Sequence, residues 1–258
     1  MTVELAPTSR RHIDVVGSLT PRDELVLLAR TLWRQGYADQ LGGHITYRLD
    51  DGSMLVNPWE LAWDELMPED VLRIDLDGNL LEGRWSVPGG IPLHLALHQQ
   101  RHDVKISVHN HPRWGTVWAD LGRVPSIYDQ SGAFVGGDVA FFDRYSTVAT
   151  VAEATDAIGA LGDCKMAFLA HHGVLIVATS IHQAYLRAVT LEWRCRQAYL
   201  IETAGGARPM PPEAAEFTGL SDGRDRYPNM LWLAAARREL RLDHDLCDAV
   251  GAHAGEER

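Results

Sequence analysis

The chain carries the stretch KISVHNH at residues 105–111, and Pro112 follows it directly. Its alternation predicts a buried strand with Ser107, His109 and His111 on one face. Two histidines at i and i+2 on a strand lie about 7 Å apart at the backbone, and imidazole nitrogens bind zinc at about 2.1 Å. We therefore predict that His109 and His111 are two ligands of one divalent metal ion. Two hydrogen-bonded core histidines are the alternative interpretation.

The composition of the 258-residue chain, with 46% hydrophobic and 23% charged residues, is typical of a globular protein. A formal net charge of −11 argues against nucleic acid or an anionic membrane as a partner, because phosphate binding needs a basic surface. No apolar run approaches the roughly 20 residues of a membrane span. Residues 1–16 lack the apolar core of a signal peptide, and we interpret them as a loose polar lead-in. Three widely spaced cysteines without a CxxC pair favour a reducing cytoplasm.

Upstream of residue 105 the pattern predicts one helix and then β-hairpins. Thr20 and Pro21 suit the N-cap and first position of a helix that Gly36 closes. Asp-Asp-Gly and Asp-Gly-Asn turns then separate short apolar segments. No GxGxxG or GxxxxGK[ST] motif occurs, so a nucleotide-binding fold is not indicated. The expected strands are 45–49, 54–56, 72–76 and 80–83.

Downstream, helices alternate with apolar strands. His94 and His98 share one helix face at i and i+4. His172, followed by a glycine, comes after a buried strand and can project into a cavity beside another strand. We expect one domain over residues 1–206, and a C-terminal linker and helix over residues 207–258 that pack on the body or on a neighbouring subunit. The expected helices are 92–100, 116–121, 150–161, 180–204 and 229–242; the strands are 166–170 and 174–178; residues 124–145 are a loop and 208–212 a proline-rich linker.

Several stretches, in their order along the chain, resemble the class II aldolase/adducin family. They are GGHITYRL, NPWELAWDEL, RIDLDGNLLEG, PLHLALH, HNHPRWG and AHHGVLIVA, and they lie between Leu25 and Gly206. GGIPLH, DQSGAFVGG and LEWRCRQ resemble most the bacterial adducin-like branch, which also contains decarboxylase-type and iron-oxygenase members. The resemblance implies an α/β fold with three α/β/α layers around a central, mostly antiparallel sheet. It also implies homotetramers with sites at subunit interfaces.

The resemblance places the family's three metal ligands on His109, His111 and His172. Three imidazoles with open positions are typical of a catalytic ion, since a structural site is closed by a fourth protein ligand. Zinc is the expected ion, with manganese, iron and cobalt left open. The glycine pair Gly42-Gly43 lets the backbone approach either a neighbouring strand or a ligand, and the resemblance suggests that it faces the anionic end of the substrate.

Two positions depart from the family pattern. Sugar-phosphate aldolases and epimerases of the family carry an acidic residue four positions before the histidine that matches His94, and here that position is Gly90. His44 stands where the family usually has asparagine, and it either touches the substrate or packs. The side chains that can supply a proton instead of the missing acid are His94, Tyr128, Asp129, Asp143 and Tyr145. We take His94, Tyr128 and Asp143 as catalytic candidates, and Gly42, Gly43, His44 and Gly90 as substrate-binding candidates.

The resemblance therefore implies a divalent-metal-dependent carbon–carbon lyase of decarboxylase or aldolase type. Its substrate is expected to be a small hydroxy- or oxo-carboxylate. Decarboxylation needs an electron sink at the metal more than a strong base, so the loss of the acid at Gly90 is compatible with it. Two alternatives stay open: a non-heme Fe(II) oxygenase acting on an aromatic substrate, and a non-catalytic adducin-like interaction module without a metal.

Overall fold

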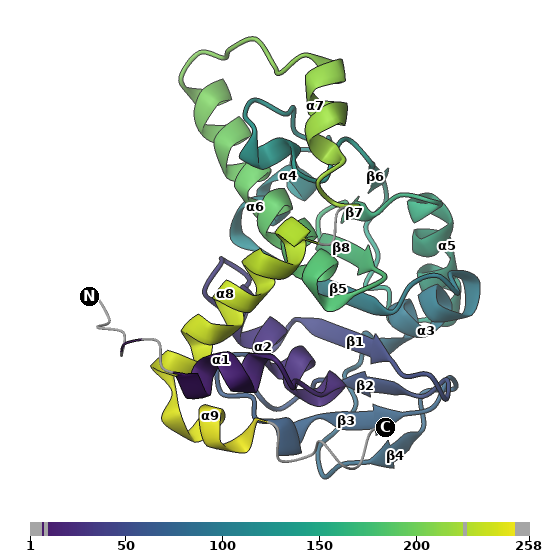
Figure 1. The fold of residues 1–258 in the computed structure, drawn as a ribbon. Coiled ribbons are helices and arrows are strands. Elements are labelled where there is room, and N and C mark those ends of the chain that lie inside the picture. Colours follow the sequence, from purple (N-terminus) through teal and green to yellow (C-terminus); the bar gives the residue numbers. More distant parts are fainter. Residues whose placement is uncertain (1–6, 8–9, 224–225, 251–258) are drawn as a thin grey trace.

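A single sheet of eight strands forms the centre of the described residues (Figure 1). The structure is a computed structural model, and it describes residue 7, residues 10–223 and residues 226–250. The strands follow the order β4-β3-β2-β1-β5-β8-β7-β6 across the sheet. Their bounds are β1 (His44–Arg48), β2 (Met54–Val56), β3 (Leu72–Ile74), β4 (Leu80–Glu82), β5 (Ile106–Asn110), β6 (Val139–Phe142), β7 (Met166–Leu169) and β8 (Gly173–Ala178).

Strand β5, which carries the KISVHNH stretch, lies in the middle of the sheet between β1 and β8. All neighbouring strands pair antiparallel except β6 and β7, which are parallel. Both predicted hairpins, β1–β2 and β3–β4, form as expected. The mostly antiparallel α/β fold predicted from the sequence is therefore confirmed.

Helices cover both faces of the sheet. The helices are α1 (Arg10–Val16), α2 (Pro21–Trp33), α3 (Ile91–Gln100), α4 (Arg113–Asp120), α5 (Val151–Leu161), α6 (Ile181–Thr203), α7 (Pro212–Gly219), α8 (Arg226–Leu242) and α9 (His244–Ala249), with 3-10 turns η1 (Pro68–Asp70) and η2 (Ser131–Ala133). Helix α2 starts as predicted, because Thr20 and Asp23 form a capping box around Pro21. No helix in residues 10–223 and 226–250 is long and apolar enough to cross a membrane.

The two faces of β5 point into different cores. Ile106 and Val108 belong to the core that α2, α6 and α8 cover. Leu175, the register partner of His109, belongs instead to the core beneath α3 and α5. Because register partners share a face of the sheet, His109 points toward α3, as the predicted alternation requires.

Residues 124–145 are not an uninterrupted loop, so that prediction is wrong in part. They contain η2 and the edge strand β6. Strand β6 has only four residues, and Gly136 and Gly137 stand close before it. Its parallel partner β7 lies beyond α5 in the sequence. Strand β6 is stabilised by pairing with this distant strand, and the local sequence pattern does not indicate that pairing.

The interpretation of the N-terminal segment as a loose lead-in is wrong for residues 10–16, which form α1; residues 1–6 and 8–9 lie outside the described residues. Val16 of α1 is buried in the same core as Trp232 of α8. A seven-residue helix is marginal alone, so packing on α8 accounts for it.

The C-terminal segment holds more helix than predicted. Helix α7 begins at the end of the expected proline-rich linker, α8 starts three residues before the predicted residue 229, and α9 follows. Trp232 and Leu240 of α8 share a core with Leu28 of α2, so this segment packs on the body of its own chain (Figure 1). The division of the chain at residue 206 stays a prediction.

Candidate metal centre

Three histidines meet where β5 ends and where β7 turns into β8. One ring nitrogen from each of His109, His111 and His172 lies within 4.8 Å of the other two, so the group could hold a metal ion. The ring centroids are 4.8 Å apart for His109–His172 and for His111–His172, and 5.1 Å apart for His109–His111. The structure thus brings together all three residues that the sequence suggested as ligands.

The turn that carries His172 is tight. Leu169 of β7 pairs with Gly173 of β8, which leaves three residues for the connection. His171 adopts a left-handed φ of 56°, a conformation that histidine tolerates better than most residues. A Cβ on Gly173 would lie 2.5 Å from the backbone oxygen of Asn110 and 2.6 Å from Cδ2 of His111. Only glycine therefore lets this turn approach β5.

The free nitrogens of the cluster fit a cation. Nδ1 of His109 donates to the Val174 carbonyl at 2.9 Å, and Nδ1 of His111 donates to the carboxylate of Asp39, so Nε2 of each ring stays available. Nε2 of His111 and Nδ1 of His172 are buried and have no hydrogen-bond partner. Buried polar atoms without a partner are rare in native proteins. A divalent ion held by the three rings would satisfy them.

Burial keeps the rings in the form that binds metal. It lowers the pKa of His172 to about 4, and the nearby His111 adds to the shift. It lowers the pKa of His109 well below the usual value, again with neighbouring histidines contributing. Metal ligation requires neutral imidazole, and these shifts hold both rings neutral at pH 7.

Asp39 is a site residue that the sequence reasoning missed. It lies between α2 and β1, and its carboxylate accepts the hydrogen bond from His111. A carboxylate on the far nitrogen of a ligating histidine fixes the orientation of the ring and raises its basicity. Gly42 is the local signal: a Cβ there would overlap the Asp39 carboxylate and lie 3.0 Å from Nδ1 of His111.

Gly43 makes a second close approach beside the cluster. A Cβ there would overlap the side-chain amide of Asn110 and lie 2.5 Å from the ring of Trp63. The Gly43 carbonyl accepts hydrogen bonds from Nδ2 of Asn57 at 3.1 Å and Nε1 of Trp63 at 3.2 Å. The glycine pair thus packs closely against protein groups at the edge of the histidine cluster, and its contact with a substrate stays a prediction.

His44 and His94 extend the cluster away from the three rings. His44 is the register partner of His109, and their centroids are 5.5 Å apart. His94 on α3 lies 5.9 Å from His44. Its Nδ1 is 3.1 Å from Oγ1 of Thr46, which also contacts Nε2 of His98 at 2.9 Å. His94 therefore lies behind His44, and its Nε2 has no partner.

Among the described residues, no hydrogen bond, ion pair or ring contact joins Tyr128 or Asp143, the other two catalytic candidates, to the clustered histidines. The hydroxyl of Tyr128 donates to Oε1 of Glu202 at 3.4 Å, near the end of α6. Asp143 is exposed just after β6. The imidazole of His172 donates a hydrogen bond to the backbone of Ser146, which brings the segment after Asp143 toward the cluster. Roles for Tyr128 and Asp143 stay predictions.

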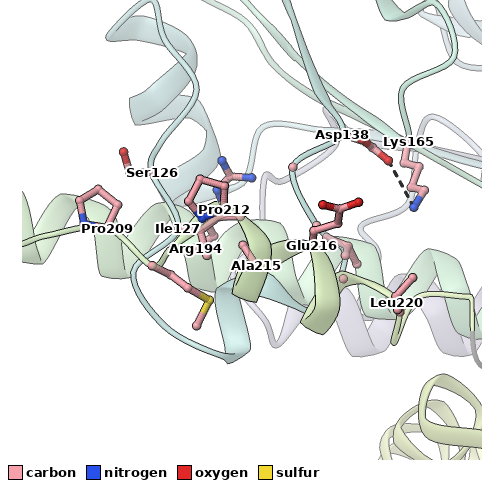
Figure 2. Close-up of a pocket in the computed structure, with 15 residues that line it drawn as sticks. Ser126, Ile127, Asp138, Lys165, Arg194, Pro209, Pro212, Ala215, Glu216 and Leu220 are labelled. Atoms are coloured by element: carbon pink, nitrogen blue, oxygen red, sulfur yellow. Dashed lines mark ion pairs between the residues drawn. The ribbon is translucent and has the colours of Figure 1, made fainter.

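A hollow of about 510 Å³ lies elsewhere, between α7 and the segment that joins η2 to β6 (Figure 2). Lys165 and Asp138 form an ion pair of 3.4 Å at its edge. Lys165 precedes β7, whereas His172 follows it, so the hollow and the cluster lie at opposite ends of that strand. None of the three histidines lines the hollow. The candidate site is defined by its donor atoms and not by the size of a cavity.

The chain is similar in sequence and fold to known proteins. A 3,4-dihydroxyphthalate decarboxylase from Arthrobacter keyseri is 33% identical over 208 residues, which cover 75% of this chain and 83% of that protein. A 5-methylthioribulose-1-phosphate/5-deoxyribulose-1-phosphate aldolase from Rhodospirillum rubrum is 30% identical over 186 residues, covering 68% of this chain and 81% of that protein. The solved structure of L-fuculose 1-phosphate aldolase from Glaciozyma antarctica PI12 superposes with a TM-score of 0.76 at 25% identity, over 95% of this chain and 96% of that one.

The family model described as "Class II Aldolase and Adducin N-terminal domain" matches residues 23–199. This range contains all eight strands and the three clustered histidines. The chain therefore belongs to the class II aldolase and adducin family.

Proposed function

We propose that this protein is a divalent-metal-dependent carbon–carbon lyase that decarboxylates a small hydroxy- or oxo-carboxylate. The observation that carries the proposal is the cluster of His109, His111 and His172, in which one nitrogen of each ring lies within 4.8 Å of the others. Relatives of the chain are decarboxylases and aldolases, which supports a lyase. The decarboxylase relative acts on 3,4-dihydroxyphthalate, an aromatic hydroxycarboxylate, so this compound is the first substrate to test.

The chain's own residues would divide the work as follows. His109, His111 and His172 would hold the ion, and Asp39 would orient His111. The ion, when bound, supplies a sink for the negative charge that remains on the substrate after the carbon–carbon bond breaks. Burial of the cluster in a low-dielectric surrounding strengthens such electrostatic stabilisation.

Gly90 favours decarboxylation over aldol cleavage. An aldol cleavage needs a group that removes a proton from the substrate hydroxyl, and glycine at this position offers none. Decarboxylation needs stabilisation of the developing charge more than a base. Of the predicted proton donors, His94 is the one with a ring contact to His44, at a centroid distance of 5.9 Å.

We further propose zinc as the ion and a homotetramer as the working assembly, with sites between subunits. The exposed face of α6 supports an assembly, because Trp193, Tyr199 and Leu200 are 38–44% exposed there. Apolar side chains gathered on one helix face commonly mark an interaction surface. A neighbouring copy could then bring Tyr128 or Asp143 to a site. Three free cysteines fit a reducing cytoplasm.

Elemental analysis of protein purified without oxygen tests the proposal most directly. We expect close to one divalent ion per chain and CO₂ release from 3,4-dihydroxyphthalate. His109→Ala and His111→Ala should each remove both metal and CO₂ release, whereas His102→Ala, an exposed histidine, should retain both. Full metal content after either change at the cluster would refute the site. Turnover under anoxia with zinc would exclude the oxygenase alternative.

A further inference from the structure

The imidazole of His44 fills the space that a side chain at position 90 would occupy. Gly90 has φ −82° and ψ 5°, a conformation open to any residue, so its backbone does not require glycine. A Cβ at Gly90 would overlap Cε1 of His44 and lie 2.7 Å from its Nδ1 and 3.1 Å from its Nε2. The lack of space therefore explains the glycine at position 90. The imidazole of His44 and a side chain at position 90 cannot occupy the same space.

The ring of His44 is confined on several sides. His44 is the first residue of β1 and lies directly opposite His109, and the centroids of the two rings are 5.5 Å apart. The ring centroid of His94 lies 5.9 Å from that of His44, at an interplanar angle of 77°. Nδ1 of His44 is buried and has no hydrogen-bond partner. No described residue therefore holds Nδ1 in one protonation state, and a neutral ring can carry its proton on either nitrogen.

Charge distinguishes this arrangement from one with an acid at position 90. A carboxylate there would add negative charge beside the ion and repel an anionic ligand. A neutral imidazole donates a hydrogen bond to a carboxylate, and hydrogen bonds to charged acceptors are the strong ones. Among the described side chains, Asp39 is the carboxylate bonded to the cluster, so a divalent ion would leave the site with net positive charge.

We infer that the His44–Gly90 pair is a specificity determinant that selects ligands carrying a carboxylate next to their metal-binding oxygens. This inference rests on the proposed function, since it presumes an ion on the three histidines. It adds to the proposed function that His44 binds the carboxylate of the ligand, and it explains why position 90 is a glycine.

Two matched probes test it by binding alone. Catechol and 2,3-dihydroxybenzoate both offer paired hydroxyl oxygens, and only the second carries a neighbouring carboxylate. Titrations of the cobalt(II)-loaded protein, followed by calorimetry and visible absorption, would give the ratio of the two affinities. We expect His44→Ala to reduce the preference for 2,3-dihydroxybenzoate by about 10- to 100-fold, the value of a hydrogen bond to a charged group. Catechol affinity and cobalt content should stay within twofold.

Gly90→Ala provides an independent variant, because its methyl group must displace the imidazole without removing it. It should reduce the preference as His44→Ala does. The double variant should be no worse than His44→Ala alone, since the added methyl then has room, and this non-additivity identifies the contact. His102→Ala and Gly159→Ala serve as controls, because His102 is exposed and a Cβ at Gly159 meets open space.

An unchanged preference in cobalt-loaded His44→Ala would overturn the inference, as would additive effects in the double variant. Failure of the proposed function looks different. Protein that binds no ion, or that binds ions equally well without His109 and His111, would refute the metal site itself. A protein that loads cobalt and shows the His44-dependent preference, but releases no CO₂ from 3,4-dihydroxyphthalate, would keep the inference and remove that substrate.

Discussion

The carboxylate of Asp39 accepts a hydrogen bond from Nδ1 of His111, although the two residues are 72 positions apart in the sequence. The antiparallel pairing of β1 with β5 explains the contact. Asp39 precedes β1 and His111 follows β5, and antiparallel strands bring the start of one beside the end of the other. The sheet topology thus places a carboxylate on the far nitrogen of His111, a proposed metal ligand.

Asp39→Asn should therefore weaken metal binding without unfolding the protein. Loss of a partner that orients a metal ligand typically costs 10- to 100-fold in metal affinity. We expect a decrease of that size in zinc affinity, measured by competition with a chromophoric chelator. Asp163→Asn, at an exposed carboxylate, is the matched control. Equal zinc affinity in Asp39→Asn and the parent protein would mean that the carboxylate has no part in the site.

The two glycines of the pair should behave differently when changed to alanine. Gly42→Ala places its methyl against Asp39 and His111, so it should reduce zinc affinity and add little to Asp39→Asn in a double variant. Gly43→Ala presses on Asn110 and Trp63, so it should mainly reduce stability, by about 1–3 kcal/mol as for other overpacked sites. Chelator competition and urea unfolding of each variant separate the two effects. The reverse pattern would contradict the assignment.

The sequence identified the three histidines that cluster, and their role as metal ligands stays a prediction. The i, i+2 spacing on one strand face indicated His109 and His111, and the resemblance to the family indicated His172. Asp39 was missed because its contact with His111 depends on the pairing of β1 with β5. The residues next to Asp39 in the sequence do not indicate that pairing. The reason for Gly90 was hidden in the same way, since His44 reaches it only through the packing of α3 on the sheet.

The secondary structure likewise divides into elements with local sequence signals and elements that depend on distant contacts. Strands β1 to β4 were predicted because turn residues mark their hairpins locally. Strand β6 was missed because its hydrogen bonds are made with β7, a parallel strand that follows α5 in the sequence. Helix α1 was missed because packing on α8, far along the chain, stabilises it.

A buried ion pair ties the segment after α7 to helix α6. Asp222 accepts from Nε and Nη2 of Arg187 at 2.8 and 2.7 Å, and both side chains are almost fully buried. Removing one partner of a buried pair typically costs about 3–5 kcal/mol, because the other charge is left uncompensated. We expect Asp222→Ala to lower the free energy of unfolding by that amount in urea. Asp248→Ala, whose pair with Arg11 is exposed, should cost less than about 1 kcal/mol.

Glu192 should make stability depend on pH in a distinctive direction. Its carboxylate accepts from the backbone N–H groups of Trp114 and Gly115 at 2.8 and 2.9 Å, at the start of the helix that follows His111. Burial raises its pKa from 4.5 to about 7, although those two hydrogen bonds oppose the shift. Between these values the unfolded chain has lost the proton and the folded chain keeps it, so stability due to this group falls as pH rises.

Glu192→Gln has no proton to lose, so it should gain stability relative to the parent as pH rises from 4.5 to 7. At about 1.4 kcal/mol for each pH unit of pKa shift, the difference between the two proteins should change by roughly 3 kcal/mol across this window. Urea unfolding of both proteins at pH 5, 6, 7 and 8 measures it. Glu213→Gln, at an exposed position on α7, should show a flat difference. A difference for Glu192→Gln that is also flat would mean that the carboxyl group titrates alike in the folded and unfolded chain, and that its two backbone hydrogen bonds offset its burial.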